Sequence, residues 1–428
     1  MKRNHHASYN STDRKWVMPL TVLGVLCCLF LITVRRAKYP AAGKAGFTPS
    51  TSSGKWESRF SGGGFEDPLK LPKLPRFAYL ISGTKGEVPQ VKRLLQALYH
   101  PRNYYLLHLD LEASDAERLE LAKYVKSENS VLRTIGNVMV IGKADLVTYR
   151  GPTMIASTLH GIAVLLKLAG DWDWFVNLSS SDYPLMPQDD ILHIFSYLPR
   201  DLNFMEHTSS IGWKEFQRAR PIIIDPGLYH SKKSGVFSAK EKRSMPASFK
   251  LFTGTYLCSE WVVLTRAFLE FCVWGWDNLP RTVLMYYTNF LASQEGYFHT
   301  VVCNHKDYQN TTVNHDLHYI TWDNPPKQNP VSLTTEHFQD MVASGAPFAR
   351  RFEKGDHVLD RIDAELLKRS ANGFTPGSWC LGNPGPGKDP CVVHGSSDVV
   401  KPSISSKRLE KLVLKLLDSE SFRSKQCI

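Results

Sequence analysis

The sequence predicts an α/β fold whose sheet is mainly parallel, and the alternation of two kinds of segment leads to this class. Compact apolar segments, typical of buried strands, occur at residues 76–82, 104–110 and 137–142. Segments with the helical spacing of apolar residues separate them at 88–99 and 115–125. Strands that alternate with helices pair in parallel, because each helix crosses the sheet before the next strand begins.

Two further elements extend this pattern before it weakens. Pro152 suits the first turn of a helix, and the apolar residues between 155 and 166 fall on one stripe. The strand DWFVNLS follows at 173–179 and ends in SSSDYPL. Later loops, rich in Trp, Tyr, Arg and Pro, are expected of a substrate-binding half. A basic amphipathic helix around Leu409 closes the chain, and its Lys/Arg face is expected to contact solvent.

The predicted strand ends gather polar residues that suit a nucleotide site. In open α/β sheets, ligands bind outside the carboxyl ends of the strands. This rule places three groups on one rim: Ser82–Gly83–Thr84, Asp110 and Ser180–Ser181–Asp182. We therefore expect the substrate site at this edge of the sheet.

The N-terminal region is predicted to anchor the chain in a membrane. Residues 16–34 contain no charge and are bracketed by pairs of basic residues, and their length is close to the roughly 20 residues that span a bilayer. This segment exceeds the core of a cleavable signal peptide, which favours an uncleaved signal anchor. Residues 1–15 are then a cytoplasmic tail, and the part of the chain after the anchor is lumenal. Residues 35–75, rich in Gly, Pro and Ser, are expected to form a flexible stem.

The formal net charge of +11 does not indicate a nucleic-acid partner. Most of the excess lies in the first 56 residues, whereas the rest of the chain is almost balanced. A nucleic-acid-binding domain needs its positive charge on the folded body, and none of the familiar nucleic-acid motifs occurs.

Six cysteines follow the predicted anchor, and an oxidising lumen permits them to form disulfides. Cys380 and Cys391, which flank a loop rich in Gly and Pro, are the best local pair, and the other pairings stay open. No CxxC or other zinc-ligand spacing occurs. His315 and His318 are three apart, which could suit a metal, but no second ligand pair lies nearby, so no metal ligand is predicted.

Glu295, in the segment FLASQEGYFHT, is a candidate general base. Aromatic neighbours on its carboxyl-terminal side favour a partly desolvated carboxylate that can take a proton. The alternative is an uninvolved, solvated loop residue. Asp171–Trp172–Asp173 has the letters of a metal-binding Asp-x-Asp motif, but it precedes a strand and so lies at the wrong end of the sheet. Without a metal, Arg350 and Arg351 are candidates to hold a leaving diphosphate.

Eight segments, in order, resemble a known family. They are FAYLISGTKG, LLQALYHPRNYYLLHLDLEAS, VTYRGPTMIASTLHG, FVNLSSSDYPLMPQDDI, FKLFTG, WGWDNLPRTVLMYYTNF, SQEGYFHTVVCN and APFARRFE. Together they resemble plant members of the core-2/I-branching glycosyltransferase family, most specifically the plant β-glucuronosyltransferases that act on arabinogalactan proteins. The match extends from about residue 76 to the C-terminus.

The resemblance implies a variant nucleotide-sugar-binding (GT-A-like) fold and an inverting, metal-independent transfer without a cofactor. The implied donor is UDP-glucuronic acid and the implied acceptor is an arabinogalactan glycan. Glu295 matches the catalytic base of the family. The donor site is assigned to Ser82, Gly83, Thr84, Asp110, Arg150, Asp182, Arg350 and Arg351. Acceptor or sugar-carboxylate binding is assigned to Lys214, Arg218, Arg220 and Trp261. Another cation of the family aligns near His318.

The resulting expectation is a single-pass type II protein of the Golgi membrane. Residues 76–368 form the lumenal catalytic domain, and residues 369–428 form an extension packed on it. Asn310 is the expected N-glycosylation site, whereas Asn177 is expected to stay unmodified on its strand.

Two departures from the family pattern leave alternatives open. Thr255 to Cys258 are interposed residues in LFTGTYLCSEW, and Gln294 occupies a position where relatives commonly have proline. The alternatives are an enzyme that uses another UDP-sugar, N-acetylglucosamine or xylose, and a non-catalytic glycan-binding membrane protein.

Overall fold

The computed structural model describes residues 72–428, except 230–234, 256–259, 326–328, 384 and 386–387. The predicted cytoplasmic tail, membrane anchor and nearly all of the stem lie outside the described residues. Within the described part of the chain, no helix combines the length and the apolar character that crossing a membrane requires.

A seven-stranded sheet forms the centre of the described residues, with strand order β10-β6-β9-β4-β1-β2-β3. Its strands are β1 (Phe77–Gly83), β2 (Tyr104–Leu109), β3 (Val138–Val140), β4 (Trp174–Ser179), β6 (Asn203–Phe204), β9 (Val263–Thr265) and β10 (Thr312–Val313). The pairs β1–β2, β1–β4, β2–β3 and β6–β10 are parallel, and only β9 runs antiparallel to its neighbours β4 and β6. The prediction of an α/β fold with a mixed, mainly parallel sheet is confirmed.

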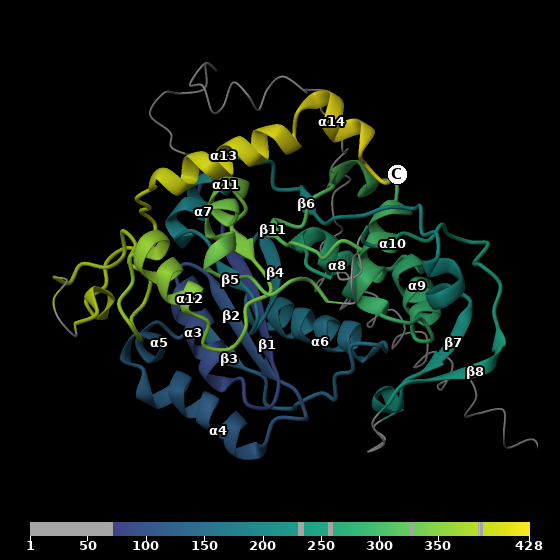
Figure 1. Cartoon of the computed structure of the whole chain (residues 1–428), viewed down its shortest axis with the longest axis horizontal. Helices are drawn as coiled ribbons and strands as arrows, with labels where there is room; N and C mark the ends of the chain where they lie inside the picture. The colour runs from purple at the N-terminus through teal and green to yellow at the C-terminus, as the bar shows by residue number, and fades with distance from the viewer. Residues whose placement is uncertain (1–71, 230–234, 256–259, 326–328, 384, 386–387) are drawn as a thin grey trace, which may run out of the picture. The chain divides into compact units, whose positions relative to one another are not determined.

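Helices cover both faces of this sheet, as Figure 1 shows for α3 and α6 on either side of β1. The first half contributes α3 (Val88–Leu98), α4 (Asp115–Lys123), α5 (Ser130–Ile135), α6 (Thr153–Leu168) and α7 (Gln188–Ser196). The second half contributes α8 (Arg266–Trp274), α9 (Leu279–Tyr287), α10 (Tyr297–Cys303), α11 (Phe338–Ser344), α12 (His357–Ile362), α13 (Ile404–Leu416) and α14 (Ser419–Ser424).

Alternate residues of β1 point into two separate cores. Phe77, Tyr79 and Ile81 pack in a cluster with residues of α3 and α7, whereas Ala78 and Leu80 pack in a second cluster with residues of α6 and α8. A parallel strand that is buried on both faces has a continuous apolar sequence, which is why FAYLI does not alternate with polar residues.

A smaller sheet beside the large one carries the arginine pair. It has the order β11-β12-β5, formed by β11 (His318–Tyr319), β12 (Phe348–Ala349) and β5 (Tyr183–Pro184). The Arg350 N–H donates to Tyr319 O at 3.0 Å, and the Phe352 N–H donates to Ser181 O at 2.9 Å. These bonds attach the segment that carries Arg350 to the loop at the end of β4. A separate hairpin consists of β7 (Pro221–Ile224) and β8 (Phe237–Lys242).

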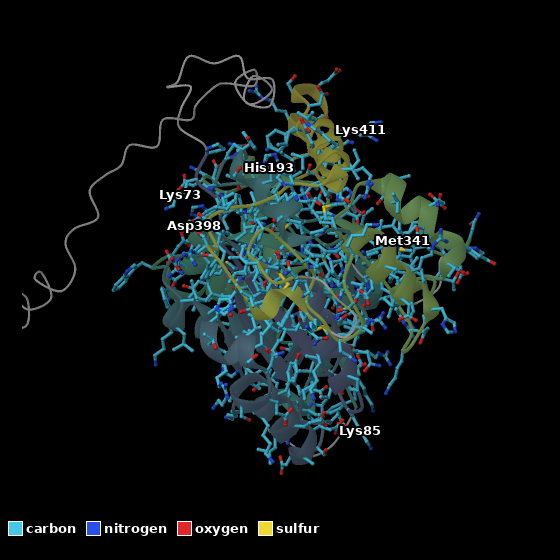
Figure 2. All side chains as sticks on the ribbon, turned by 90° about the vertical axis from the view of Figure 1, so that its left-hand side faces the viewer. Lys73, Lys85, His193, Met341, Asp398 and Lys411 are labelled. Carbon is cyan, nitrogen blue, oxygen red and sulfur yellow. A yellow bond between two sulfur atoms is a disulfide. The ribbon has the colours of Figure 1, made fainter. Side chains whose placement is uncertain are left out.

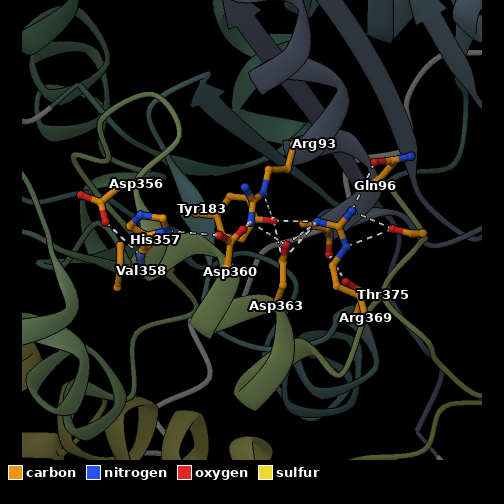
Figure 3. Close-up of polar contacts among 12 residues, drawn as sticks. Arg93, Gln96, Tyr183, Asp356, His357, Val358, Asp360, Asp363, Arg369 and Thr375 are labelled. Atoms are coloured by element: carbon orange, nitrogen blue, oxygen red, sulfur yellow. Dashed lines mark hydrogen bonds and ion pairs between the residues drawn. The ribbon is translucent and has the colours of Figure 1, made fainter. Parts of the chain in front are cut away.

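The C-terminal residues are tied to the rest of the described chain by a buried polar network (Figure 3). Arg369, whose side chain is 1% exposed, forms an ion pair with Asp363 and donates to the Tyr183 hydroxyl at 2.7 Å and to Gln96 Oε1 at 3.2 Å. Arg93 of α3 contacts Asp363 from the other side at 2.8 Å. Side chains from three separate parts of the sequence, around residues 93–96, 183 and 363–369, therefore meet here.

Helix α13 lies with its apolar side on the body, because Leu409 and Val413 are fully buried. Lys411 lies on its outer, exposed face, so the predicted solvent-facing basic side is confirmed (Figure 2). The Cys380–Cys391 disulfide is also confirmed, and a second disulfide joins Cys303 to Cys427.

Candidate active site

A cavity of about 420 Å³ opens at the carboxyl ends of β1, β2 and β4. Most of the predicted rim residues line it: Ser82, Gly83, Thr84, Asp110, Ser180 and Ser181. Trp261 lines it as well. The sheet topology thus brings together residues nearly 180 positions apart, as the strand-end rule predicts.

Two carboxylates join the loops at the rim of the cavity. Asp110 Oδ1 accepts hydrogen bonds from the Thr84 hydroxyl at 2.9 Å and from the Glu112 N–H at 3.1 Å. Burial raises the pKa of Asp110, and these hydrogen bonds oppose the rise. Glu87 Oε2 accepts from the Thr84 N–H at 2.8 Å and from the Ser180 hydroxyl at 2.7 Å. These hydrogen bonds fix the positions of the rim loops relative to one another.

Gly83 allows the rim to approach helix α3. A Cβ atom at this position would come within 2.7 Å of Val91 Cγ2, so a larger residue would push the turn away from the helix. Helix α3, which follows this turn, starts at Val88 and has Pro89 in its first turn.

Asp182 lies behind the cavity wall, which differs from its predicted contact with the donor. It is 1% exposed and does not line the cavity. Its Oδ2 accepts from the Ser179 N–H at 2.6 Å and from Trp261 Nε1 at 2.8 Å. In this structure Asp182 fixes the indole of Trp261, because a buried carboxylate retains its hydrogen-bond donors strongly.

Glu295 is fully buried in the short turn before α10. Its Oε1 accepts from the Tyr149 hydroxyl at 2.8 Å, and its Oε2 forms an ion pair with Arg218. Burial raises the pKa of Glu295, while Arg218 and Tyr149 oppose the rise. The predicted partly desolvated environment is therefore present, and it includes a counter-ion.

The residue after Glu295, the candidate base, has to be glycine. A Cβ atom on Gly296 would collide with the Tyr287 hydroxyl, which is hydrogen-bonded to the backbone and to Thr300 and so does not yield easily. Gln294, on the other side of the base, donates from Nε2 to Tyr149 O at 3.0 Å. This bond ties the turn of Glu295 to the loop that carries Tyr149.

The three predicted acceptor-side cations already have protein partners. Lys214 and Arg218 are buried; Lys214 Nζ donates to Gly254 O, and Arg218 pairs with Glu295. Arg220 pairs with Glu215 on the surface. None of the three lines the cavity.

The predicted phosphate-side arginines lie in different environments. The Arg150 side chain is exposed. The Arg150 backbone oxygen accepts a hydrogen bond from the Ala292 N–H. Arg351 is paired with Glu353 at 2.8 Å and is about one-third exposed. Arg350 is 9% exposed, and its guanidinium lies 3.2 Å from the centroid of the Trp261 ring.

Sequence reasoning missed Glu260 and Tyr149, which both line the cavity. Burial raises the pKa of Glu260 to about 8, with Arg350 opposing the rise. Tyr149 connects the cavity to the buried base through its hydroxyl. Tyr149 lies within the quoted segment VTYRG, whereas Glu260 directly follows residues outside the described set and has no pattern of its own.

Of the remaining predicted residues, Asp171, Asp173 and Asn310 lie away from the cavity, whereas Asn177 lines it. Asp171 accepts from the Tyr104 hydroxyl at 2.7 Å and Asp173 from the Arg76 N–H at 2.8 Å, at the amino ends of the strands, as their position before β4 predicts. Asn310 is exposed, and both groups of the Asn177 side chain are hydrogen-bonded to residues 260 and 262.

Comparison with known proteins gives consistent matches over the described domain. The family model described as Core-2/I-Branching enzyme matches residues 77–342. Beta-glucuronosyltransferase GlcAT14C of Arabidopsis thaliana is 60% identical over 100% of both chains. Beta-glucuronosyltransferase GlcAT14A of the same plant is 55% identical over 97% of this chain and 94% of the relative. Human Xylosyltransferase 2 is 29% identical over 74% of this chain and 36% of its own length.

Proposed function

Because the chain belongs to the Core-2/I-branching enzyme family, we propose that it is an inverting β-glucuronosyltransferase. It transfers glucuronic acid from UDP-glucuronic acid to β-galactan side chains of type II arabinogalactan on arabinogalactan proteins. The observation that carries this proposal is Glu295, a fully buried carboxylate that Tyr149 links to the cavity.

The chemistry requires one base. Glu295 accepts the proton of an acceptor hydroxyl, the hydroxyl oxygen forms a bond to the anomeric carbon, and the bond from that carbon to the diphosphate oxygen breaks. UDP leaves with the bonding electrons. Attack on the face opposite UDP inverts the configuration, which gives a β linkage from the α-linked donor. A positioned base contributes ~10²–10⁴-fold in rate.

Burial suits Glu295 to this role. A carboxylate in water is too weak a base for a sugar hydroxyl, whereas desolvation favours its protonated form. Arg218 keeps the carboxylate charged before the reaction, and Tyr149 fixes its orientation. Transfer of the proton therefore needs little reorganisation around the carboxylate.

The relatives support glucuronic acid as the transferred sugar. The two Arabidopsis proteins named as β-glucuronosyltransferases share more than half of their residues with this chain over nearly its full length. The xylosyltransferase is much less similar. Another UDP-sugar remains the alternative, and UDP-glucose, UDP-xylose and UDP-N-acetylglucosamine belong in the same assay.

An active enzyme is also favoured over a non-catalytic glycan-binding protein. The interposed residues from Thr255 to Cys258 lie mostly outside the described residues, but both of their flanks are tied to the site. The Gly254 N–H donates to Glu295 O at 2.9 Å, and Asn177 Nδ2 donates to Glu260 O at 3.0 Å.

We further propose a type II orientation in the Golgi membrane, with the catalytic domain in the lumen. Residues 16–34 supply the anchor in this proposal. The disulfides Cys303–Cys427 and Cys380–Cys391 support it, because such bonds persist in oxidising compartments. Asn310, exposed near the surface turn at residues 309–311, is the proposed glycosylation site.

The test is UDP release by the purified full-length chain with UDP-glucuronic acid and β-linked galacto-oligosaccharides in EDTA. We expect turnover in EDTA and a fall of ~10²–10⁴-fold in kcat for Glu295→Gln. Glu365→Gln, an exposed carboxylate on the surface, is the matched control and should retain the rate. Retained turnover in Glu295→Gln would remove the proposed base, and wild-type protein that binds galactan but releases no UDP would favour the non-catalytic alternative.

A further inference from the structure

A group of buried polar atoms around Glu260 and Trp261, which both line the cavity, has no hydrogen-bond partner among the described residues. The atoms are Glu260 Oε2, Arg350 Nε and Nη1, Asp182 Oδ1 and His318 Nε2. Buried polar atoms in proteins are nearly always paired. Several such atoms in one place therefore indicate a missing polar group.

Glu260 is held rigidly at this place by β4. Asn177 Nδ2 donates to Glu260 O at 3.0 Å, and the Val262 N–H donates to Asn177 Oδ1 at 3.0 Å. One amide side chain thus holds the backbone on both sides of Trp261. Glu260 and Trp261 line the cavity, and the Glu260 side chain is 12% exposed.

Arg350 is positioned by stacking on Trp261 and by ion pairs with two carboxylates. Its guanidinium lies over the Trp261 ring, which Asp182 fixes from behind. Its Nε is 3.6 Å from Asp182 Oδ1, and its Nη1 is 3.7 Å from Glu260 Oε1. Both contacts are ion pairs longer than a hydrogen bond, so Nε and Nη1 can still donate a hydrogen bond to a further acceptor.

The other buried cations near the cavity are already in use, since Arg218 pairs with Glu295 and Lys214 donates to Gly254 O. We infer that Arg350 and Glu260 form the subsite that binds the carboxylate of the transferred uronic acid, an assignment that rests on the proposed function. Arg350 supplies the positive charge. Glu260 supplies a hydrogen-bond donor from Oε2.

Burial, more than the surrounding charges, raises the pKa of Glu260 and favours its neutral form. Asp182 from the end of β4 and Glu295 from the turn before α10 repel a second negative charge, and Arg350 after β12 attracts one. Gln294, the remaining polar neighbour, is uncharged. Burial outweighs Arg350 and raises the pKa of Glu260 to about 8. At neutral pH the Glu260 carboxyl therefore donates to a sugar carboxylate, which its ionised form would repel.

The experiment compares UDP-glucuronic acid with UDP-glucose, because these donors differ only at C6, a carboxylate in one and a hydroxymethyl group in the other. For wild type, Glu260→Gln, Glu260→Leu and Arg350→Gln, kcat/KM is measured with both donors from pH 6 to 9.5. Glu365→Gln is the control, because it lies on the surface at residues 363–367 and should leave all values unchanged.

We expect Glu260→Gln to keep the preference for UDP-glucuronic acid, because its amide still donates. We expect kcat/KM of wild type to fall above about pH 8, where Glu260 loses its proton. In Glu260→Gln this fall should be absent. Glu260→Leu should lose about 10- to 100-fold of the preference, the range for a hydrogen bond to a charged group. Arg350→Gln should lose the preference to a similar extent.

Two results would overturn the subsite. One is an equal effect of Glu260→Leu on both donors, and the other is an unchanged alkaline fall in Glu260→Gln. If wild type turns over no donor, calorimetric binding of the same two donors decides the question separately. Tighter binding of UDP-glucuronic acid that Glu260→Leu abolishes would then retain the subsite although the proposed catalysis has failed, and equal binding of both donors would reject it.

Discussion

Replacing Arg218 by methionine tests how the base is kept charged. The side chains of Arg218 and Glu295 are 7% and 0% exposed, so their ion pair is removed from water almost completely. Breaking such a pair by removing one partner costs ~3–5 kcal/mol, because the remaining charge is buried without compensation. Methionine replaces the aliphatic part of the arginine side chain, although it removes the guanidinium that lies over the Trp213 ring.

The loss should depend on pH, since Glu295 can bind a proton in place of its counter-ion. The pKa of Glu295 is already raised by burial, and without Arg218 it rises further. The unfolded chain releases this proton near its ordinary pKa, whereas the folded variant keeps it, so folding binds a proton and the variant loses stability as pH rises. We expect a small loss at pH 5 and the full ~3–5 kcal/mol at pH 8.

Chemical denaturation at pH 5 and pH 8 measures the stability, and the pH profile of kcat/KM reports the base. The acidic limb of that profile should move to higher pH in Arg218→Met, because activity requires an ionised Glu295. The double variant Arg218→Met, Glu295→Gln should recover part of the stability at pH 8, since it leaves no unpaired charge. Equal losses at both pH values together with an unmoved acidic limb would refute the reasoning.

Three further predictions follow from the same contacts. Tyr149→Phe removes the hydroxyl that donates to Glu295 Oε1, so the pKa of Glu295 should rise and kcat/KM at pH 6 should fall about 10- to 100-fold, the range for a hydrogen bond to a charged group. The fall should disappear at high pH, where Glu295 is ionised in both proteins, and an equal fall at pH 9 would indicate a direct catalytic role for Tyr149. Replacing both Cys303 and Cys427 by serine should lower the free energy of unfolding by ~4–5 kcal/mol, because the disulfide closes a loop of 124 residues. Replacing both Cys380 and Cys391 should lower it by only ~3 kcal/mol, because that loop spans 11 residues. A larger loss for the second pair in chemical denaturation would contradict the loop-closure argument. Glu260→Gln should raise the melting temperature at pH 8 and leave it nearly unchanged at pH 4.5. Between these pH values the folded wild type keeps the proton on Glu260 whereas the unfolded chain releases it, so wild type loses stability as pH rises and the variant does not. An increase that is the same at both pH values would point to packing instead.

The first half of the fold was predictable because each element there has a periodic signature. The strands β1, β2 and β4 are buried on both faces and so are continuous apolar segments, and α3 and α6 carry clear stripes. Their predicted bounds differ from the observed ones by a few residues at most. The predicted strand at 137–142 is shorter, Val138–Val140, because the chain leaves β2 after the Ile141 N–H donates to Leu107 O and then enters the loop towards Tyr149.

The second half could not be predicted in this way. Strands β6, β9 and β10 contain two or three residues each, which is too short for a period of two to appear. Their order in the sheet, with β9 between β6 and β4, depends on crossovers that no local pattern specifies. The Cys303–Cys427 pair likewise depends on where α10 and the end of the chain meet.

In the candidate site, the position of a residue along its strand predicted that it lies at the rim, whereas the sequence did not predict which side chains contact one another. Ser82, Thr84 and Asp110 lie where the ends of parallel strands must meet. The partners of Glu295, in contrast, come from 77 and 146 residues earlier in the chain, and nothing in the sequence around Arg218 links it to the base. For this reason the sequence assigned Arg218 to the substrate, whereas the structure shows it bound to the carboxylate.

The network around Arg369 determines how the protein should unfold. Arg369 is the first residue after the predicted boundary at 368, and yet it is buried against Asp363, Tyr183 and Gln96 (Figure 3). Separation at this boundary would expose an ion pair and two hydrogen bonds that no part can replace alone. The catalytic residues and the C-terminal segment should therefore melt in one cooperative calorimetric transition, and a chain cut after residue 368 should be degraded rather than fold.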